Sequence, residues 1–279
     1  MTVTVTAAAA VLAIAVVVRA FLPVVLVAPA DRPSAGTAWR EPRTLLIGVL
    51  VLAFALTEGA ANDWLAIALV DRGKVVSVQA FGDRNARGDP LTVDTIMYGA
   101  SLTKAVFGYY AMMLVDDGKL KLDRPIAAML PKPLPDYGNL DAYGNWGDLA
   151  GDARWRKITP RHLLTHSSGF ANFSFLEPDG KLKFHFDPGT RYAYSGEGII
   201  LLQFAIEQGL RVDVGAEVSR RIFAPLKMNR TSLKWRPDFA ANLADGWDAD
   251  GKPEPHDERS RVRAAGSMDT NITDMAKFA

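Results

Sequence analysis

Ser101 and Lys104 stand three residues apart at the start of an apolar stretch, AVFGYYAMMLV at 105–115. Residues three apart in an α-helix lie on the same face, so the Lys104 amine is expected beside the Ser101 hydroxyl. Because the stretch is apolar on almost every side, we expect the helix to be buried and the amine desolvated. Burial disfavours the ammonium form, and a neutral amine can take the proton that a serine loses when it becomes a nucleophile.

The helix start also has free backbone N–H groups, and that of Ser101 is suited to stabilise the oxyanion formed when a serine attacks a carbonyl. A four-residue pattern is weak evidence alone. This one is the only Ser-x-x-Lys in the chain, and it follows a predicted β-hairpin, WLAIALV (64–70) and KVVSVQAF (74–81), with Gly73 at the turn. We therefore treat it as the start of a buried helix that carries a reactive serine.

The chain from Trp64 to Ala279 resembles the serine β-lactamase-like hydrolases, a family of class C β-lactamases, D-alanyl-D-alanine peptidases and related esterases. The resemblance rests on six segments in the family's order: LVDRGKVVSVQAFGDRN (69–85), YGASLTKAVFGYYAMMLVDDGKLKLDRPI (98–126), ITPRHLLTHSSGF (158–170), FDPGTRYAYSGEGIILLQ (186–203), PLKMNRTSLKW (225–235) and RAAGSMDTNITDMAKFA (263–279). It implies an α+β, transpeptidase-like fold, in which an antiparallel sheet packs against the nucleophile helix beside a mostly helical region. It implies no cofactor and no metal.

Two departures from the family pattern bear on the site. The family's Tyr-x-Asn motif corresponds to Tyr194, Ser195 and Gly196, so the phenol is kept but the amide that would hold an acylamino substituent is absent. The family's third motif, Lys-Thr-Gly or a His-containing equivalent, does not occur before Ala279. We therefore expect the C-terminal strands to be missing, and the 279-residue chain to be a poorly stable and nearly inactive fragment.

The composition fits one hydrolase-sized domain, expected at 61–279, behind an apolar leader at 1–60. Apolar residues make up 49% of the chain and charged residues 23%, enough for a sizeable core. The formal net charge is +1, and scattered basic residues offer no stripe for nucleic acid. The chain has no cysteine, which excludes disulfides and thiolate metal sites.

The leader contains an interrupted apolar tract at 5–18 and 20–30 and a second run, TLLIGVLVLAFALT, at 44–57. The lengths suit two membrane helices, or a single signal or anchor at 40–60; a pair of buried soluble helices is the alternative. The basic residues between the runs place that linker in the cytoplasm by the positive-inside rule; they are Arg32, Arg40 and Arg43. We expect a protein anchored in the cell membrane, with its catalytic domain on the periplasmic or extracellular side.

Elsewhere, the patterns predict short helices at 160–168, 196–209 and 213–225, and a loop over 131–153. Gly118 is expected to end the nucleophile helix. The DADG sequence at 248–251 lacks the flanking acidic ligands of a calcium loop, which favours a turn.

Other candidate site residues carry weaker patterns. His166 invites a Ser-His-Asp interpretation with Ser167 or Ser168, but neighbours on one turn rarely align for catalysis, so we favour a structural role. Thr103 stands where a nucleophile elbow starting at Gly99 would need glycine, which disfavours an α/β-hydrolase. Three other histidines lack metal-ligand spacing; they are His162, His185 and His256. Four aromatic residues fit either the core or an apolar acyl pocket, with the core favoured; they are Phe186, Tyr192, Trp235 and Trp247.

Together the residues and the resemblance predict a serine hydrolase of small esters, amides or D-amino-acid peptides. Ser101 would form an acyl-enzyme while Lys104 and Tyr194 move its proton, and the resemblance alone supplies the tyrosine. An esterase or peptidase is favoured over a true β-lactamase because Gly196 removes the amide clamp. The alternative is a non-catalytic membrane-anchored sensor or a truncated, inactive relative.

Overall fold

The computed structural model describes residues 64–71, 73–248 and 250–279. The described residues from Ala66 to Ala279 belong to one compact unit. The apolar runs of the predicted leader lie outside the described residues. Among the helices that are described, none is both long and apolar enough to cross a membrane.

The predicted hairpin is present. Strand β1 (Trp64–Asp71) pairs with β2 (Lys74–Gly82), and Gly73 between them has a φ of +71°, a left-handed conformation that suits glycine. Helix α8 (Ile272–Phe278) packs against β2. The last helix of the chain therefore packs on the hairpin formed by the first two described strands.

A second strand pair fixes the backbone that leads into the Ser-x-x-Lys helix. Strand β3 (Met97–Tyr98) pairs antiparallel with β8 (Asp269–Thr270), with Tyr98 opposite Asp269. Segments far apart in the sequence thereby meet directly before Ser101.

Helix α4 (Leu102–Asp116) carries the predicted motif at its start. It ends as predicted, with Asp117 as the C-cap and Gly118 in a left-handed conformation at φ +72°. The expectation that the helix is buried on nearly all sides is wrong. One stripe is exposed, because residues spaced by three and four share a face; its members are Leu102, Ala105, Tyr109 and Met112.

The helical region is built from α5 (Pro160–Leu164), α6 (Gly196–Leu210) and α7 (Val214–Val218), the last continued by a π-helical turn at Ser219–Phe223. Helix α5 is shorter than the predicted 160–168. It ends at Leu164 because the φ of His166, at +54°, does not fit an α-helix. The predicted loop at 131–153 contains 3₁₀ turns and a minimal pair, β4 (Asn139–Leu140) with β5 (Gly144–Asn145). The remaining 3₁₀ turns and strand pair complete the described elements; they are Ile126–Ala128, Leu134–Tyr137, Trp146–Leu149, Ala153–Lys157, Ser174–Leu176, Pro237–Asn242, β6 (Gly246–Trp247) and β7 (Pro253–Glu254).

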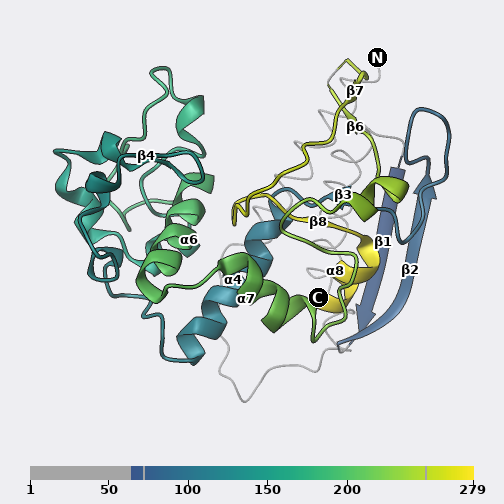
Figure 1. Cartoon of the computed structure of the whole chain (residues 1–279), viewed down its shortest axis with the longest axis horizontal. Coiled ribbons are helices and arrows are strands. Elements are labelled where there is room, and N and C mark those ends of the chain that lie inside the picture. The colour runs from purple at the N-terminus through teal and green to yellow at the C-terminus, as the bar shows by residue number, and fades with distance from the viewer. Residues whose placement is uncertain (1–63, 72, 249) are drawn as a thin grey trace, which may run out of the picture. The chain divides into compact units, whose positions relative to one another are not determined.

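Helix α6 is the centre of the hydrophobic core, and every residue from Gly196 to Ile206 is buried. Phe204 on this helix packs against three aromatic rings, with centroids 4.9 to 5.7 Å away; they belong to Tyr137, Tyr143 and Trp146. Figure 1 shows α4 between the region that contains α6 and the region that contains β2 and α8. The start of α4 is thus placed where residues from both regions can reach it.

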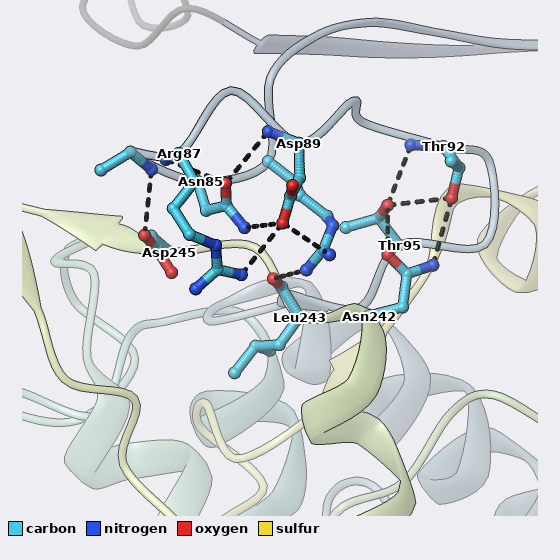
Figure 2. A network of polar contacts seen from close by, with 10 residues as sticks. Asn85, Arg87, Asp89, Thr92, Thr95, Asn242, Leu243 and Asp245 are labelled. Atoms are coloured by element: carbon cyan, nitrogen blue, oxygen red, sulfur yellow. Dashed lines mark hydrogen bonds and ion pairs between the residues drawn. The ribbon is translucent and has the colours of Figure 1, made fainter.

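A polar network holds the segment between β2 and β3 against residues 242–245 (Figure 2). Within it, the Asn85 side chain donates to Asp89 at 2.7 Å, and the Thr95 hydroxyl donates to Asn242 at 3.0 Å. Because β3 begins directly after this segment, the network fixes the position from which the chain enters the site. The Gly251 N–H donates to the Asp248 carbonyl at 3.1 Å, which is the hydrogen bond expected of the predicted turn.

Candidate active site

The structure brings Ser101, Lys104 and Tyr194 together. The Lys104 ammonium group donates to Ser101 Oγ at 2.8 Å and to the Ala265 carbonyl oxygen at 2.6 Å. It also lies 4.8 Å from the centroid of the Tyr194 ring. The first of these contacts comes from helical spacing alone, whereas the other two join segments distant in the sequence.

The backbone before Ser101 is turned sharply and held from two sides. Ala100 has a φ of +41°, which is rare and costly for a residue with a side chain. The buried Thr103 hydroxyl donates to the Ala100 carbonyl at 2.6 Å and accepts the Met268 N–H at 3.1 Å. The Gly99 N–H donates to the Met268 carbonyl at 2.8 Å. These bonds fix the backbone at the start of the helix, so Ser101 keeps its position although Ala100 before it is strained.

His166 positions the tyrosine and is not part of a serine triad. Its Nδ1 accepts the Ser195 N–H at 3.1 Å, its carbonyl accepts the Ala193 N–H at 2.8 Å, and its ring lies 4.5 Å from the Tyr194 ring. Among the described residues the Ser167 hydroxyl bonds to Thr165 and to the His162 carbonyl, not to the His166 ring. The structural role favoured for this histidine is confirmed.

Two pKa shifts follow from this arrangement. Burial raises the pKa of the Tyr194 phenol, but polar contacts with Lys104 and Ser101 and the charge of Lys104 outweigh burial and lower it from 10.0. Burial lowers the pKa of His166 from 6.5, and the charge of Lys104 lowers it further. Each shift favours the form without the proton, the phenolate of Tyr194 more than in an ordinary tyrosine and the neutral ring of His166.

Ser101 opens onto a cleft of about 630 Å³. The cleft is lined by Tyr98 and Ala100, by Phe173, Phe175 and Ile200, and by most of 257–267. Within this segment, Arg259 donates to the buried Asp269 at 2.7 Å and its guanidinium lies 4.1 Å from the centroid of the Tyr98 ring. The sequence did not predict that 257–267 forms one wall of the cleft, because this wall exists only when the loop folds back across β3.

The four aromatic residues predicted for the core or an acyl pocket serve neither purpose. None of them lines the cleft, and none belongs to the buried core. The Trp235 ring packs against the His256 ring at a tilt of 45° with centroids 4.6 Å apart, and Tyr192 is largely exposed. The described residues contain no group of three His, Cys, Asp or Glu side chains placed to hold a metal.

The family profile of the Beta-lactamase family matches residues 58–279, most of the chain. The chain belongs to this family. The Ser-x-x-Lys at the head of α4 and the tyrosine ahead of α6 therefore lie in a β-lactamase-type domain, as the resemblance implied. The functional roles of Ser101, Lys104 and Tyr194 stay predictions.

The chain is also similar to curated proteins with varied names. Monacolin J acid methylbutanoyltransferase of Aspergillus terreus is 31% identical over 206 residues, covering 62% of this chain and 48% of the transferase. Lovastatin esterase of Penicillium rubens is 27% identical over 218 residues, covering 68% of this chain and 54% of the esterase. The chain thus spans about half the length of these curated relatives.

A solved class C β-lactamase confirms the predicted fold. It superposes with a TM-score of 0.63 at 19% identity, and the match covers 83% of this chain and 62% of the lactamase. The α+β, transpeptidase-like architecture of the Beta-lactamase family is therefore present, with its antiparallel strands paired two by two in the described part.

Proposed function

We propose that this chain contains the active site of a serine hydrolase that works through an acyl-enzyme on Ser101. The observation that carries the proposal is the 2.8 Å contact between Lys104 Nζ and Ser101 Oγ, at a helix start that opens onto a cleft. The names of the esterase and acyltransferase relatives support acyl transfer.

The proposed reaction has two acyl transfers. Ser101 Oγ attacks the substrate carbonyl carbon while its proton passes to the Lys104–Tyr194 pair. The Ser101 N–H, which has no hydrogen-bond acceptor among the described residues, donates to the oxyanion. The bond to the alcohol or amine then breaks, and the pair returns the proton to that leaving group. Water attacks the acyl-enzyme by the same route, releasing the acid and Ser101.

Small esters are the favoured substrates, with amides and D-amino-acid peptides next. The position of the family asparagine is Gly196, so this position supplies no side-chain amide to bind an acylamino group. A site that lacks a hydrogen-bond partner loses selectivity for the substrate group that would match it. The name of the lovastatin esterase also supports an ester substrate.

A fluorophosphonate probe tests the proposal, because it labels only an activated serine. We expect labelling of the wild-type chain and of Ser260→Ala, a control serine in the same cleft that has no neighbouring lysine contact, and none of Ser101→Ala. Ester turnover then marks a hydrolase. Lasting acylation without turnover would instead mark a sensor, and absence of any reaction an inactive relative.

We also propose that the residues beyond about 60 lie outside the cytoplasm, anchored through the apolar leader. The support is the sequence alone: two apolar runs joined by a linker with three arginines.

A further inference from the structure

Gly196, the first residue of α6, lies directly under an aromatic ring. A Cβ atom at this position would stand 2.4 Å from Cε1 and 2.5 Å from Cζ of Phe173. Real Cβ atoms do not approach other atoms this closely, so the ring occupies the space that any side chain at 196 would need. The glycine is thus matched to Phe173, and the site of the missing amide is filled by an apolar group.

The backbone that carries Phe173 is fastened to the start of α6. The Ser195 hydroxyl donates to the Ala171 carbonyl at 2.8 Å, and the Gly196 N–H donates to the Asn172 side chain at 2.9 Å. The buried Glu197 side chain accepts the Ser174 N–H at 2.8 Å. Bonds on both sides of Phe173 therefore hold its ring in place over Gly196, two residues after Tyr194.

Phe175 extends this surface. Its ring stacks on that of Phe173 with centroids 5.1 Å apart and an interplanar angle of 10°. Phe175 is nevertheless 72% exposed. A large apolar ring that is held in a fixed stack yet left in water marks a surface suited to an apolar ligand.

Three aromatic rings line the cleft, but the centroid of the Tyr98 ring lies 4.1 Å from the Arg259 guanidinium, which leaves the stacked pair as its uncharged apolar surface. Both line the cleft that contains Ser101, where Ile200 is buried and exposes almost nothing. The segment that forms the other lining is mostly polar or charged; its members include Asp257, Glu258, Arg259, Ser260 and Arg261. An apolar group of a substrate bound at Ser101 would therefore gain most by packing on Phe173 and Phe175.

We propose that Phe173 and Phe175 form a subsite for the hydrocarbon part of an ester substrate, in the space that Gly196 leaves free. The inference rests on the proposed function, since it names the substrate class of the same cleft. Each methylene that leaves water for an apolar surface is worth about a two- to fourfold gain in affinity, depending on how fully it is buried. The site is thus expected to prefer longer or aromatic esters over acetyl esters.

Phe175→Ala tests the subsite, and Leu176→Ala is the matched control. Leu176 is the next residue, is 62% exposed and does not line the cleft, so both variants remove an exposed apolar side chain. We would measure kcat/KM for p-nitrophenyl acetate, butyrate, hexanoate and octanoate, and for acetate esters of alcohols of rising chain length. In the wild type and in Leu176→Ala one of the two series should rise with length, which identifies the acyl or the alcohol side. In Phe175→Ala that rise should flatten, with about a tenfold loss for the longest ester.

A binding measurement separates failure of the subsite from failure of the proposed function. In a Ser101→Ala background we would measure the dissociation constants of two uncleaved esters, p-nitrophenyl octanoate for the acyl side and octyl acetate for the alcohol side. For one of them the constant should increase about tenfold with Phe175→Ala and stay constant with Leu176→Ala. This holds whether or not the chain turns over esters. Equal dissociation constants in the presence and absence of Phe175, or chain-length series that Phe175→Ala leaves unchanged, would overturn the subsite.

The pairing of glycine and ring provides a second test. Gly196→Ala should displace Phe173 and flatten the chain-length preference together with a lower thermal midpoint. Adding Phe173→Ala to Gly196→Ala should restore the midpoint, because the ring that the new Cβ meets is gone, but not the preference. A Gly196→Ala variant with wild-type midpoint and preference would contradict the assignment.

Discussion

The Nδ1 atom of His166 lies 3.1 Å from the backbone nitrogen of Ser195 and accepts its hydrogen bond. The bond requires a neutral ring, since a protonated imidazole has no acceptor nitrogen. Tyr194 precedes Ser195, and the centroid of its ring lies 4.5 Å from that of the His166 ring. The protonation state of one side chain therefore controls how the phenol is held beside Lys104.

This relationship predicts an acid-sensitive site. The pKa of His166 is lower in the folded chain than its ordinary 6.5, so the unfolded state binds a proton first as the pH falls. The stability from this residue is present above about 6.5 and is lost between that value and the lower folded pKa. We expect the thermal midpoint and kcat to fall together below pH 6.5.

His166→Asn supplies the control for this prediction. Asparagine tolerates the φ of +54° and its side-chain oxygen accepts a hydrogen bond without titrating in this range. The variant should keep activity near neutral pH and lose the His-dependent part of the acid decline. Identical pH profiles of midpoint and kcat in both proteins would assign the acid sensitivity to other groups.

Removal of either proton-transfer group should slow catalysis with little effect on the fold. Lys104→Ala and Tyr194→Phe are each expected to lower kcat/KM for p-nitrophenyl butyrate by about 10²–10⁴, the usual contribution of a general acid or base. Tyr192→Phe is the matched control, since this exposed phenol lies two residues away and outside the Ser101 contacts. Wild-type rates in Tyr194→Phe would exclude the phenol from proton transfer.

Thr103→Val should destabilise the chain and distort the site. Valine keeps the shape of threonine but leaves the Met268 N–H without its buried partner. The Ala100 carbonyl loses the hydroxyl and keeps only the backbone N–H of residue 103 at 3.1 Å. A buried group left unpaired costs about 1–3 kcal/mol in the free energy of unfolding. Thr190→Val, on an exposed turn, should stay within about 0.5 kcal/mol. Denaturant unfolding of both variants checks the difference, and equal midpoints would show that Thr103 is dispensable.

Local patterns predicted much of the fold and the first contact of the site. Helical spacing alone brings Lys104 to Ser101, glycine conformations mark the turn at Gly73 and the helix end at Gly118, and α6 was placed within one residue at its end. Tyr194 came from the family resemblance, since no local rule links it to a residue so far away in the chain.

Features that depend on contacts between distant segments could not be predicted from the sequence. The cleft wall at 257–267 is fixed by the β3–β8 pairing, and the ring of Phe173 lies over Gly196 only because 171–174 is bonded to α6. The exposed stripe on α4 was missed because composition shows that a helix is apolar but not which face its neighbours cover.

Export is testable with fusions that need no knowledge of the substrate. Alkaline phosphatase folds only outside the cytoplasm, so its fusion after residue 90 should be active, and a reporter that works only in the cytosol should be silent there. The matched control removes the apolar runs at 5–30 and 44–57, and should reverse both results. Cytosolic activity of the full-length fusion would contradict the predicted topology.

Substrate preference is the sharpest test of Gly196. In place of a side-chain amide, this position presents the Phe173 ring, which offers an apolar contact but no hydrogen bond. A cephalosporin with an acylamino group loses the partner that would select it, whereas a simple ester needs none. We therefore expect a higher kcat/KM for p-nitrophenyl butyrate than for nitrocefin. The double variant Phe173→Ala with Gly196→Asn exchanges the ring for an amide. It should lower the ratio of kcat/KM for p-nitrophenyl butyrate to kcat/KM for nitrocefin. A wild-type preference for nitrocefin would instead show that the site selects lactams without this amide.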